Sequence, residues 1–198
     1  KIVTKELTSA YEATGSLPAE KPFFEESGVR LYADAKHAQR LFKATGPQGT
    51  LADVVRAHLD TAKAGDYVAI LAYLDMNAAH QAELAAARVQ IRDARRLATC
   101  LEFGPRFLHS TGQAYKGGPN SGVFLQITCD DAADLQVPGA KYTFGVVKAA
   151  QARGDFAVLV ERGRRALRVH LGRDTKAGIA TLRAALNEAL DKPAQAAR

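Results

Sequence analysis

The sequence DYVAILAYLDMNAAHQAELAAARVQIRDARRLATCLEF, residues 66–103, decides the predicted fold. It begins with an apolar run of strand length at residues 66–74 and ends with a second run at residues 96–103. Between these runs, Asn77 is placed to cap a long, alanine-rich helix that continues to about Arg95. A strand, a helix and another apolar strand in this order are typical of a parallel sheet that helices cover on both faces.

The same alternation continues on both sides of this unit. Thr50 and Asp53 form a variant of the capping box at the start of a helix, and Gly65 ends that helix. The fold class is therefore α/β: three layers, with a mostly parallel sheet of about five strands and helices on both faces. In such a sheet, ligands bind beyond the carboxyl ends of the strands. The remaining predicted strands are residues 28–34, 122–129 and 165–172, and the remaining helices are residues 2–14, 36–45, 50–65, 141–155 and 175–190, with a short helix or turn at 155–163.

A chain of 198 residues is long enough for one domain with a sizeable core. We predict an N-terminal helix with a proline-containing arm over residues 1–27, an α/β domain over residues 28–191 and a frayed tail over residues 192–198. Phe23 and Phe24 would be costly to expose, so we expect the arm to lie against this domain or a neighbouring one. The sequence does not open with Met, and we interpret it as part of a longer polypeptide.

The chain is basic, with 27 Lys and Arg against 21 Asp and Glu and a net charge of +6. A basic protein can attract nucleic acid, acidic lipid or phosphorylated metabolites. The excess charge lies in two arginine clusters that lack interleaved aromatic residues to stack on bases, so we expect solvated helix faces there and no nucleic-acid partner. No apolar run is long enough to cross a membrane, and we expect no membrane partner. The clusters are Arg162, Arg164, Arg165, Arg168 and Arg173, and Arg88, Arg92, Arg95 and Arg96.

The two cysteines, Cys100 and Cys129, lie in or at the end of apolar runs. Reduced, small core residues are the expected state for both. Neither has a second Cys or a His at metal-ligand spacing, so we predict no metal site. This use of cysteine fits a cytoplasmic protein.

Polar side chains gather around one histidine in FGPRFLHSTGQAYKGGPNSGVFLQIT, residues 103–128. A neutral imidazole gives and takes protons near neutral pH, while hydroxyl and amide groups can bind hydroxyls of a ligand and an ammonium can meet a phosphate. The alternative is a structural histidine whose hydrogen bonds go to the backbone at a strand-to-helix turn. Because the stretch follows the strand at residues 96–103, we expect it at the carboxyl edge of the sheet. The residues concerned are His109 and its neighbours Ser110, Thr111, Gln113 and Lys116.

The other four histidines give weaker evidence of a functional role. His37, His58 and His80 lie on helical segments at no shared spacing, and we expect them at the surface or its boundary. His170 falls in the last strand, where a buried histidine with satisfied hydrogen bonds is the expected role.

A carboxylate also ends one predicted strand. Glu102 lies there with Arg106 about one turn later, and a structural ion pair or a charge at a helix start is favoured over a general base. The glycine-rich segment at residues 117–122 lacks the residues that complete a P-loop or a dinucleotide-binding fingerprint.

The segment LHSTGQAYKGG, residues 108–118, resembles the histidine segment of phosphoglucose isomerases, which reads Leu-His-Ser-x-Gly-Gln before a glycine-containing loop. The resemblance implies that His109 helps to open the sugar ring by proton exchange at the ring oxygen, from the neighbouring subunit. Nearly the whole chain is similar to the last part of bifunctional transaldolase/phosphoglucose isomerase fusion proteins. The similarity lies in GDYVAILAYL, LEFGPRFLHSTGQAYKGGPNSGVFLQIT, YTFGVVKAAQARGD and GRRALRVHLG. In those fusions a Gln-Pro-Asp-Val-Glu-Ala-Ser segment leads into Lys-Ile-x-Thr, which implies that Lys1 is the counterpart of the active-site lysine.

The chain departs from the isomerase pattern in two ways. In ordinary isomerases the histidine segment precedes the lysine segment, whereas Lys1 here precedes His109. The Ser/Thr-rich phosphate loop, the enediolate-stabilising arginine and the catalytic glutamate segment have no counterpart in these residues, and Glu102 does not match the glutamate motif.

The resemblance therefore implies the C-terminal, SIS-like domain of an enzyme that interconverts glucose 6-phosphate and fructose 6-phosphate by general acid/base catalysis, without cofactor or metal. Its expected partners are the phosphorylated sugar, the rest of the parent polypeptide and a second copy in a homodimer, and the isolated chain is expected to have little or no activity. Two alternatives stay open: a non-catalytic module for dimerisation or phosphosugar sensing and, least favoured, nucleic-acid binding through the arginines. On the isomerase hypothesis the catalytic residues are His109 and Lys1, and the substrate-binding residues are Ser110, Thr111, Gln113 and Lys116.

Overall fold

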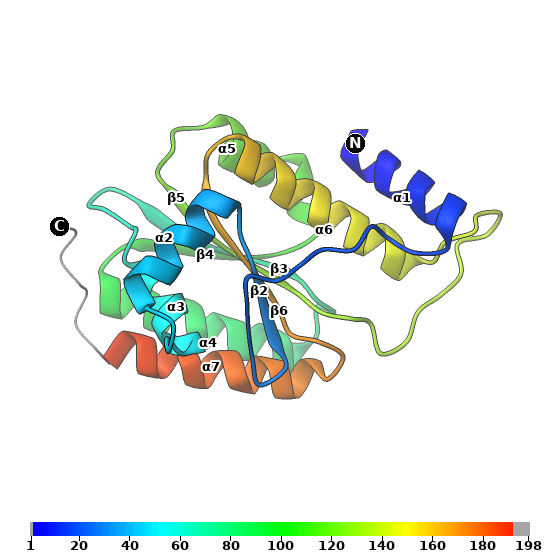
Figure 1. Ribbon diagram of the computed structural model, residues 1–198. Helices are drawn as coiled ribbons and strands as arrows, with labels where there is room; N and C mark the ends of the chain where they lie inside the picture. Colours follow the sequence, from blue (N-terminus) through cyan, green and yellow to red (C-terminus); the bar gives the residue numbers. More distant parts are fainter. Residues whose placement is uncertain (1, 192–198) are drawn as a thin grey trace.

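The computed structural model describes residues 2–191, apart from the side chains of Ile2, Leu108 and His109, and forms a six-stranded sheet between layers of helices (Figure 1). The order across the sheet is β1-β2-β6-β5-β3-β4. The last four strands of this order are parallel to one another, whereas β1 and β2 are antiparallel to their neighbours. We call the side where the parallel strands end the carboxyl edge. The strands are β1 (Phe24–Glu26), β2 (Val29–Tyr32), β3 (Tyr67–Tyr73), β4 (Ala98–Phe103), β5 (Gly122–Thr128) and β6 (Arg165–His170).

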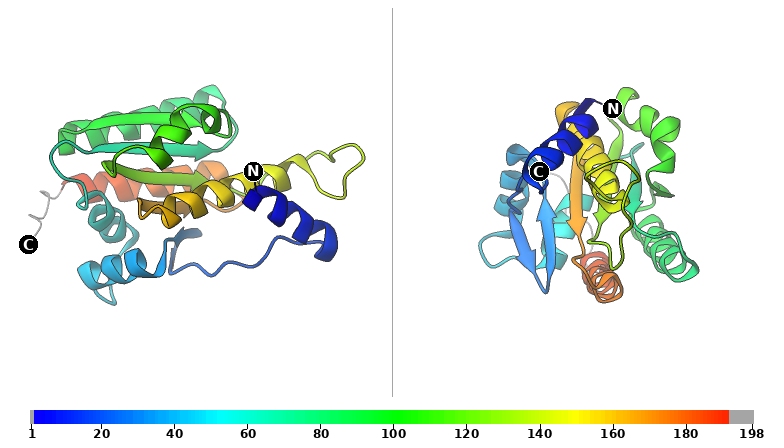
Figure 2. Two further views of the ribbon diagram at one scale, coloured as in Figure 1. Left: turned by 90° about the horizontal axis from the view of Figure 1, so that it is seen from above. Right: turned by 90° about the vertical axis from the view of Figure 1, so that its right-hand side faces the viewer.

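Helices cover both faces of the sheet. One face carries α2, α3, α4 and α7, which pack on one another, and the opposite face carries α5 and α6. Helix α1 packs along α6, on the side of the molecule away from α4 and α7 (Figures 1 and 2). The helices are α1 (Ile2–Thr14), α2 (Ala35–Thr45), α3 (Leu51–Leu59), α4 (Ala78–Arg95), the short 3-10 helix η1 (Arg106–His109), α5 (Thr111–Gly117), α6 (Phe144–Glu161) and α7 (Thr175–Asp191).

The pleat of the strands divides the core between the two faces. In β3, Val68 and Ile70 belong to the larger apolar cluster under α3, α4 and α7, while Ala69 and Leu71 belong to the smaller cluster under α6. Successive side chains of a strand point to opposite faces, so a strand that helices cover on both sides is apolar throughout. This is why the central strands read as continuous apolar runs in the sequence.

The predicted three-layer α/β fold is confirmed, including the caps that Asn77 and Thr50 provide. The predicted strand count of about five is one short, because β1 lies within the arm and pairs antiparallel with β2. We expected the arm to lie against this domain or a neighbouring one, and Phe23 and Phe24 pack against the core of this domain.

The predicted break near residue 155 is absent, because α6 is one continuous helix. At Gly154 the missing side chain lets α1 approach, since a Cβ there would lie 3.3 Å from Thr4 Oγ1. Glycine is disfavoured within a helix, but close helix packing offsets that cost here.

The predicted surface position is wrong for two histidines. The exposed fraction is 6% for His37 and 0% for His58. Their rings lie next to each other, with 2.9 Å between His37 Nε2 and His58 Nδ1, and His58 Nε2 lies 3.1 Å from the carbonyl oxygen of Phe124. The hydrogen-bonding partners of these rings lie far away in the sequence, so the local spacing of the histidines cannot reveal their burial.

The predicted solvated face is also wrong for the central arginines of one cluster. Arg164 and Arg168 are buried, and Arg165 is half-buried and ion-paired. In the other cluster, Arg95 forms a largely buried ion pair with Asp60, with 2.9 Å between Nη2 and Oδ1. These cations are engaged within the fold, which removes much of the surface charge that a nucleic-acid site would need. Over residues 2–191 no helix is both long and apolar enough to span a membrane.

Candidate functional site

The segment of η1 and α5 stands at the carboxyl edge, directly after β4, as the sequence predicts. Two buried aromatic side chains anchor it. The ring of Phe107 packs edge-on against Tyr73 with 5.5 Å between centroids, and Tyr115 packs against Phe124 at 5.4 Å. Gly112 lies where η1 and α5 meet, since a Cβ there would come within 2.8 Å of the carbonyl oxygen of Phe107.

Hydrogen bonds fix both the side and the end of α5. The Tyr115 hydroxyl donates to Glu102 Oε1 at 2.8 Å and lies 3.2 Å from the Cys100 sulfur. At the end of the helix, Arg164 Nη2 donates to the carbonyl oxygens of Lys116 and Gly118, at 2.6 Å each. A guanidinium on these carbonyls satisfies acceptors that the helix leaves free and complements the negative end of its dipole.

A large cavity, which we call the helix cavity, lies between α1, α5 and α6. Its volume is about 1200 Å³. Polar groups reach it from all three helices and from η1, while Val147 and Val158 give it apolar patches. The polar lining comprises Thr4, Lys5, Thr8, Arg106, Gln113, Lys116, Gln151, Asp155 and Glu161.

An ion pair between α5 and α6 lines the helix cavity. Lys116 Nζ contacts Asp155 Oδ1, and the Asp155 side chain is only 2% exposed. Burial raises the pKa of Asp155, against the opposing effect of Lys116. Tyr73 interacts with the same carboxyl group, and burial followed by the charge of Asp155 raises the pKa of that phenol. A buried carboxyl group with a shifted pKa beside a cavity is characteristic of functional sites, although structural ion pairs also produce it.

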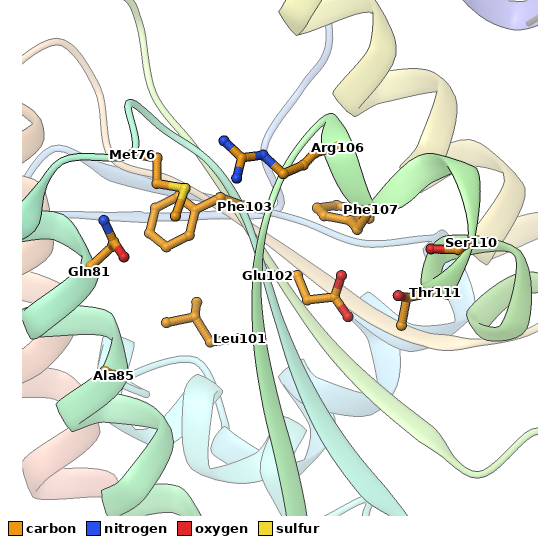
Figure 3. A pocket seen from close by; sticks show the side chains of 10 residues that line it. All are labelled: Met76, Gln81, Ala85, Leu101, Glu102, Phe103, Arg106, Phe107, Ser110 and Thr111. Atoms are coloured by element: carbon orange, nitrogen blue, oxygen red, sulfur yellow. The ribbon is translucent and has the colours of Figure 1, made fainter.

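A smaller cavity, the edge cavity, lies between α4, the edge strand β4 and the start of α5 (Figure 3). Its volume is about 420 Å³. Glu102 and Thr111 face each other in Figure 3, and Gln81, Arg106 and Ser110 complete the polar lining. Arg106 lines both cavities, and its guanidinium has no hydrogen bond or ion pair with the described side chains.

The structure divides the predicted site residues between the two cavities. Ser110 and Thr111 line the edge cavity, whereas Gln113 and Lys116 line the helix cavity. His109 is the last residue of η1 and directly precedes both pairs along the chain; its side chain is outside the description. Lys1 also lies outside the described residues.

The predicted ion pair of Glu102 with Arg106 is not among the contacts of the described side chains, since Glu102 accepts from Tyr115 instead. Sequence reasoning missed Asp155 as a site residue. The available signal was one carboxylate directly before the apolar run FAVLV, which predicts a charge on the buried side of a helix. Its partner Lys116 is far away in the sequence, so the pairing itself had no local signal.

Comparisons with known proteins show the fold alone. No family model matches the chain, and no curated protein matches it. Among solved structures, it is similar to the hypothetical protein TT0462 from Thermus thermophilus, with a TM-score of 0.60 and 14% sequence identity. The match covers 80% of this chain and 45% of that chain, so the chain spans less than half the length of its structural neighbour.

Proposed function

We propose that this chain is a domain of a sugar-phosphate isomerase that interconverts glucose 6-phosphate and fructose 6-phosphate as part of a larger transaldolase/isomerase polypeptide. The observation that carries the proposal is the position of the His109 segment. It follows β4 at the carboxyl edge, with polar side chains directed into a cavity on each side. The likeness of LHSTGQ to the histidine segment of phosphoglucose isomerases supports the same assignment.

A sugar phosphate needs a cation for its phosphate group. Arg106 is suited to this, because its guanidinium is unpartnered among the described side chains and reaches both cavities. Arginine binds phosphate oxygens through two parallel hydrogen bonds. The hydroxyls of Ser110 and Thr111, on the same side of the segment, add donors for phosphate or sugar oxygens.

The isomerisation also needs groups that move protons, first at the ring oxygen and then between two adjacent carbons through an enediolate. In this proposal His109 exchanges the ring-opening proton, while Gln113 and Lys116 orient the sugar hydroxyls. Asp155 is a positioning residue, since it holds Lys116 at the wall of the helix cavity. The resemblance assigns Lys1 to the substrate as well, and Val3 and Thr4, which follow it closely, line the helix cavity.

The first test is isomerase turnover of the full polypeptide that carries this chain, wild type against His109→Ala. We expect turnover on cyclic glucose 6-phosphate to fall by about 10²–10⁴-fold, the usual contribution of one acid/base group. An open-chain substrate that needs no ring opening should retain much more of its turnover, and it serves as the internal control. Equal losses on both substrates would refute the ring-opening role.

The second test concerns the helix cavity and uses Lys116→Met, with Lys176→Met on α7 as the matched control. We expect KM for the sugar phosphate to rise in the first variant and to stay unchanged in the second. Unchanged turnover and KM in both Lys116→Met and His109→Ala would reject catalysis and leave the module for dimerisation or phosphosugar sensing. Size measurement by light scattering then tests dimerisation directly.

The proposal includes no cofactor, no nucleic acid and no membrane partner, and it allows a homodimer. It places the protein in the cytoplasm, where the free thiols of Cys100 and Cys129 would stay reduced.

A further inference from the structure

A separate cavity lies where the sheet reverses its strand order. β3 leads through α4 to β4 on one side, and β5 leads through α6 to β6 on the other, so β3 and β5 flank the switch point. Ligands of open α/β sheets bind beyond the carboxyl ends of the strands at such a point. A cavity of about 220 Å³, which we call the switch-point cavity, is lined there by Tyr73 and Thr128, the last residues of β3 and β5. No described residue of η1 or α5 lines it.

The lining of the switch-point cavity is rich in positive charge. Four cationic side chains and two carboxylates line it, and Asp131, beside the lining, pairs with Lys148, so the local excess is one positive charge when the histidine is neutral. Burial lowers the pKa of that histidine, His170, which favours the neutral form. The cations are Arg30, Lys148, Arg153 and Arg168, and the carboxylates are Glu20 and Asp130.

Arg168 is the most deeply buried of these cations. It projects from β6 with a side-chain exposed fraction of 5%, and its guanidinium lies 4.2 Å from the centre of the Tyr32 ring. The Phe156 ring lies 5.3 Å away on α6. Removing a guanidinium from water is costly unless an anion accompanies it. The site is therefore built to hold a negative charge.

That charge now comes from the part of the arm between α1 and β1, residues 15–23. One carboxylate oxygen, Glu20 Oε2, lies 2.8 Å from Arg168 Nη2 and 2.7 Å from Arg153 Nε. Arg153 also donates to the carbonyl oxygen of Pro18 at 2.6 Å. The arm is otherwise largely exposed, and Figure 2 shows it as an extended, irregular segment between α1 and β1. A single carboxylate oxygen thus contacts two guanidiniums, each of which could donate two parallel hydrogen bonds to an anion.

We propose that the switch-point cavity binds a small phosphate, either inorganic phosphate or the phosphoryl group of a small monoester, and that Glu20 is a built-in competitor for it. Displacing Glu20 leaves a local excess of two positive charges, which a phosphate dianion would neutralise, and phosphate offers three oxygens to Arg153 and Arg168, where Glu20 offers one. The cavity has the volume of about seven water molecules at about 30 Å³ each, enough for a phosphoryl group and a short organic part. Binding displaces the Glu20 carboxylate and frees the arm from α6. This site is independent of the isomerase assignment.

The experiment is calorimetric titration of the full chain with inorganic phosphate at constant ionic strength. Glu20→Gln removes the competing charge, and we expect phosphate to bind at least fivefold more tightly than to the wild type. Glu25→Gln is the control, because Glu25 is an exposed carboxylate on β1 with no partner among the described residues. Adding Arg153→Met to Glu20→Gln should weaken binding about tenfold; this position is partly exposed, so the fold tolerates the change better than a change at Arg168.

Two further measurements separate this proposal from a purely structural role. Saturating phosphate should increase amide hydrogen exchange in the arm of the wild type, because phosphate releases Glu20. Acetate at the same ionic strength should bind much more weakly than phosphate. Equal phosphate affinity in wild type and Glu20→Gln would overturn the competition. The phosphate site would be overturned if Arg153→Met left the phosphate affinity of Glu20→Gln unchanged. It would also be overturned if acetate bound as tightly as phosphate.

Discussion

Lowering the pH from about 7.5 to about 5.5 should destabilise the fold through the buried pair of His37 and His58. The hydrogen bonds assign the tautomers. The carbonyl oxygen of Phe124 can only accept, so His58 Nε2 carries the proton and its Nδ1 accepts from His37 Nε2. The His58 ring is therefore neutral, with His37 as its donor, and a proton on His58 Nδ1 would break this chain of hydrogen bonds.

The sign and size of the effect follow from proton linkage. Burial lowers the pKa of both histidines, and the neighbouring ring lowers that of His58 further. The unfolded chain, with an ordinary histidine pKa of about 6.5, binds more protons below that pH than the folded chain does, so stability falls as the pH falls. A histidine that stays neutral in the fold loses about 1.4 kcal/mol over this interval, which gives an upper limit of about 2.7 kcal/mol for the pair.

Urea unfolding at both pH values measures this loss. The double variant His37→Gln/His58→Gln should be less stable at neutral pH but should lose less stability on acidification, by up to the same 2.7 kcal/mol or so. His80→Gln, outside the pair, should keep the wild-type pH dependence. The same pH dependence in wild type and double variant would refute the reasoning, as would nitrogen NMR spectra that place the His58 proton on Nδ1.

Three further predictions concern stability and are all measured by urea unfolding. Arg164→Met removes two charged hydrogen bonds at the end of α5 and should lower the free energy of unfolding by about 2–4 kcal/mol. The exposed Arg162→Met should lower it by less than about 0.5 kcal/mol, and equal effects would contradict a stabilising role for the Arg164 hydrogen bonds. Gly178→Ala places a Cβ within 2.6 Å of Leu171 and should cost about 1–3 kcal/mol, and a neutral result would mean that α7 shifts freely. Thr50→Ala removes the capping box of α3 and should cost about 1 kcal/mol, with Ser9→Ala, an exposed hydroxyl residue within α1, as the control.

The sequence predicts those parts of the fold that local patterns encode. The apolar run of β3 and the cap of α4 at Asn77 are such patterns, and both appear where expected. β1 was missed because three residues, Phe24–Glu26, carry no alternation, and only pairing with β2 makes them a strand. The continuous α6 was missed because Gly154 looks like a break, whereas its reason is the close approach of α1.

In the candidate site, too, the features that local patterns encode could be predicted, and those that depend on tertiary contacts could not. The position of the His109 segment at the carboxyl edge could be predicted, since it depends only on strand order along the chain. The division of its polar neighbours between two cavities could not, because that depends on which side of a short helix faces α6. Two ion pairs, Lys116 with Asp155 and Glu20 with Arg168, join segments that are distant in the sequence, so no local spacing predicts them.

The place of β6 between β2 and β5 bears on how the chain folds as it is synthesised. Among the described residues β2 pairs with the short β1 and with β6, and β6 is made only after the other five strands. Until β6 emerges, β2 has no central sheet to join and the wholly buried β5 presents an open edge. A nascent chain at that stage exposes apolar strand surface that aggregates readily. Ribosome-bound chains halted before β6 should therefore need a chaperone, and release of this strand should complete the sheet in one cooperative step.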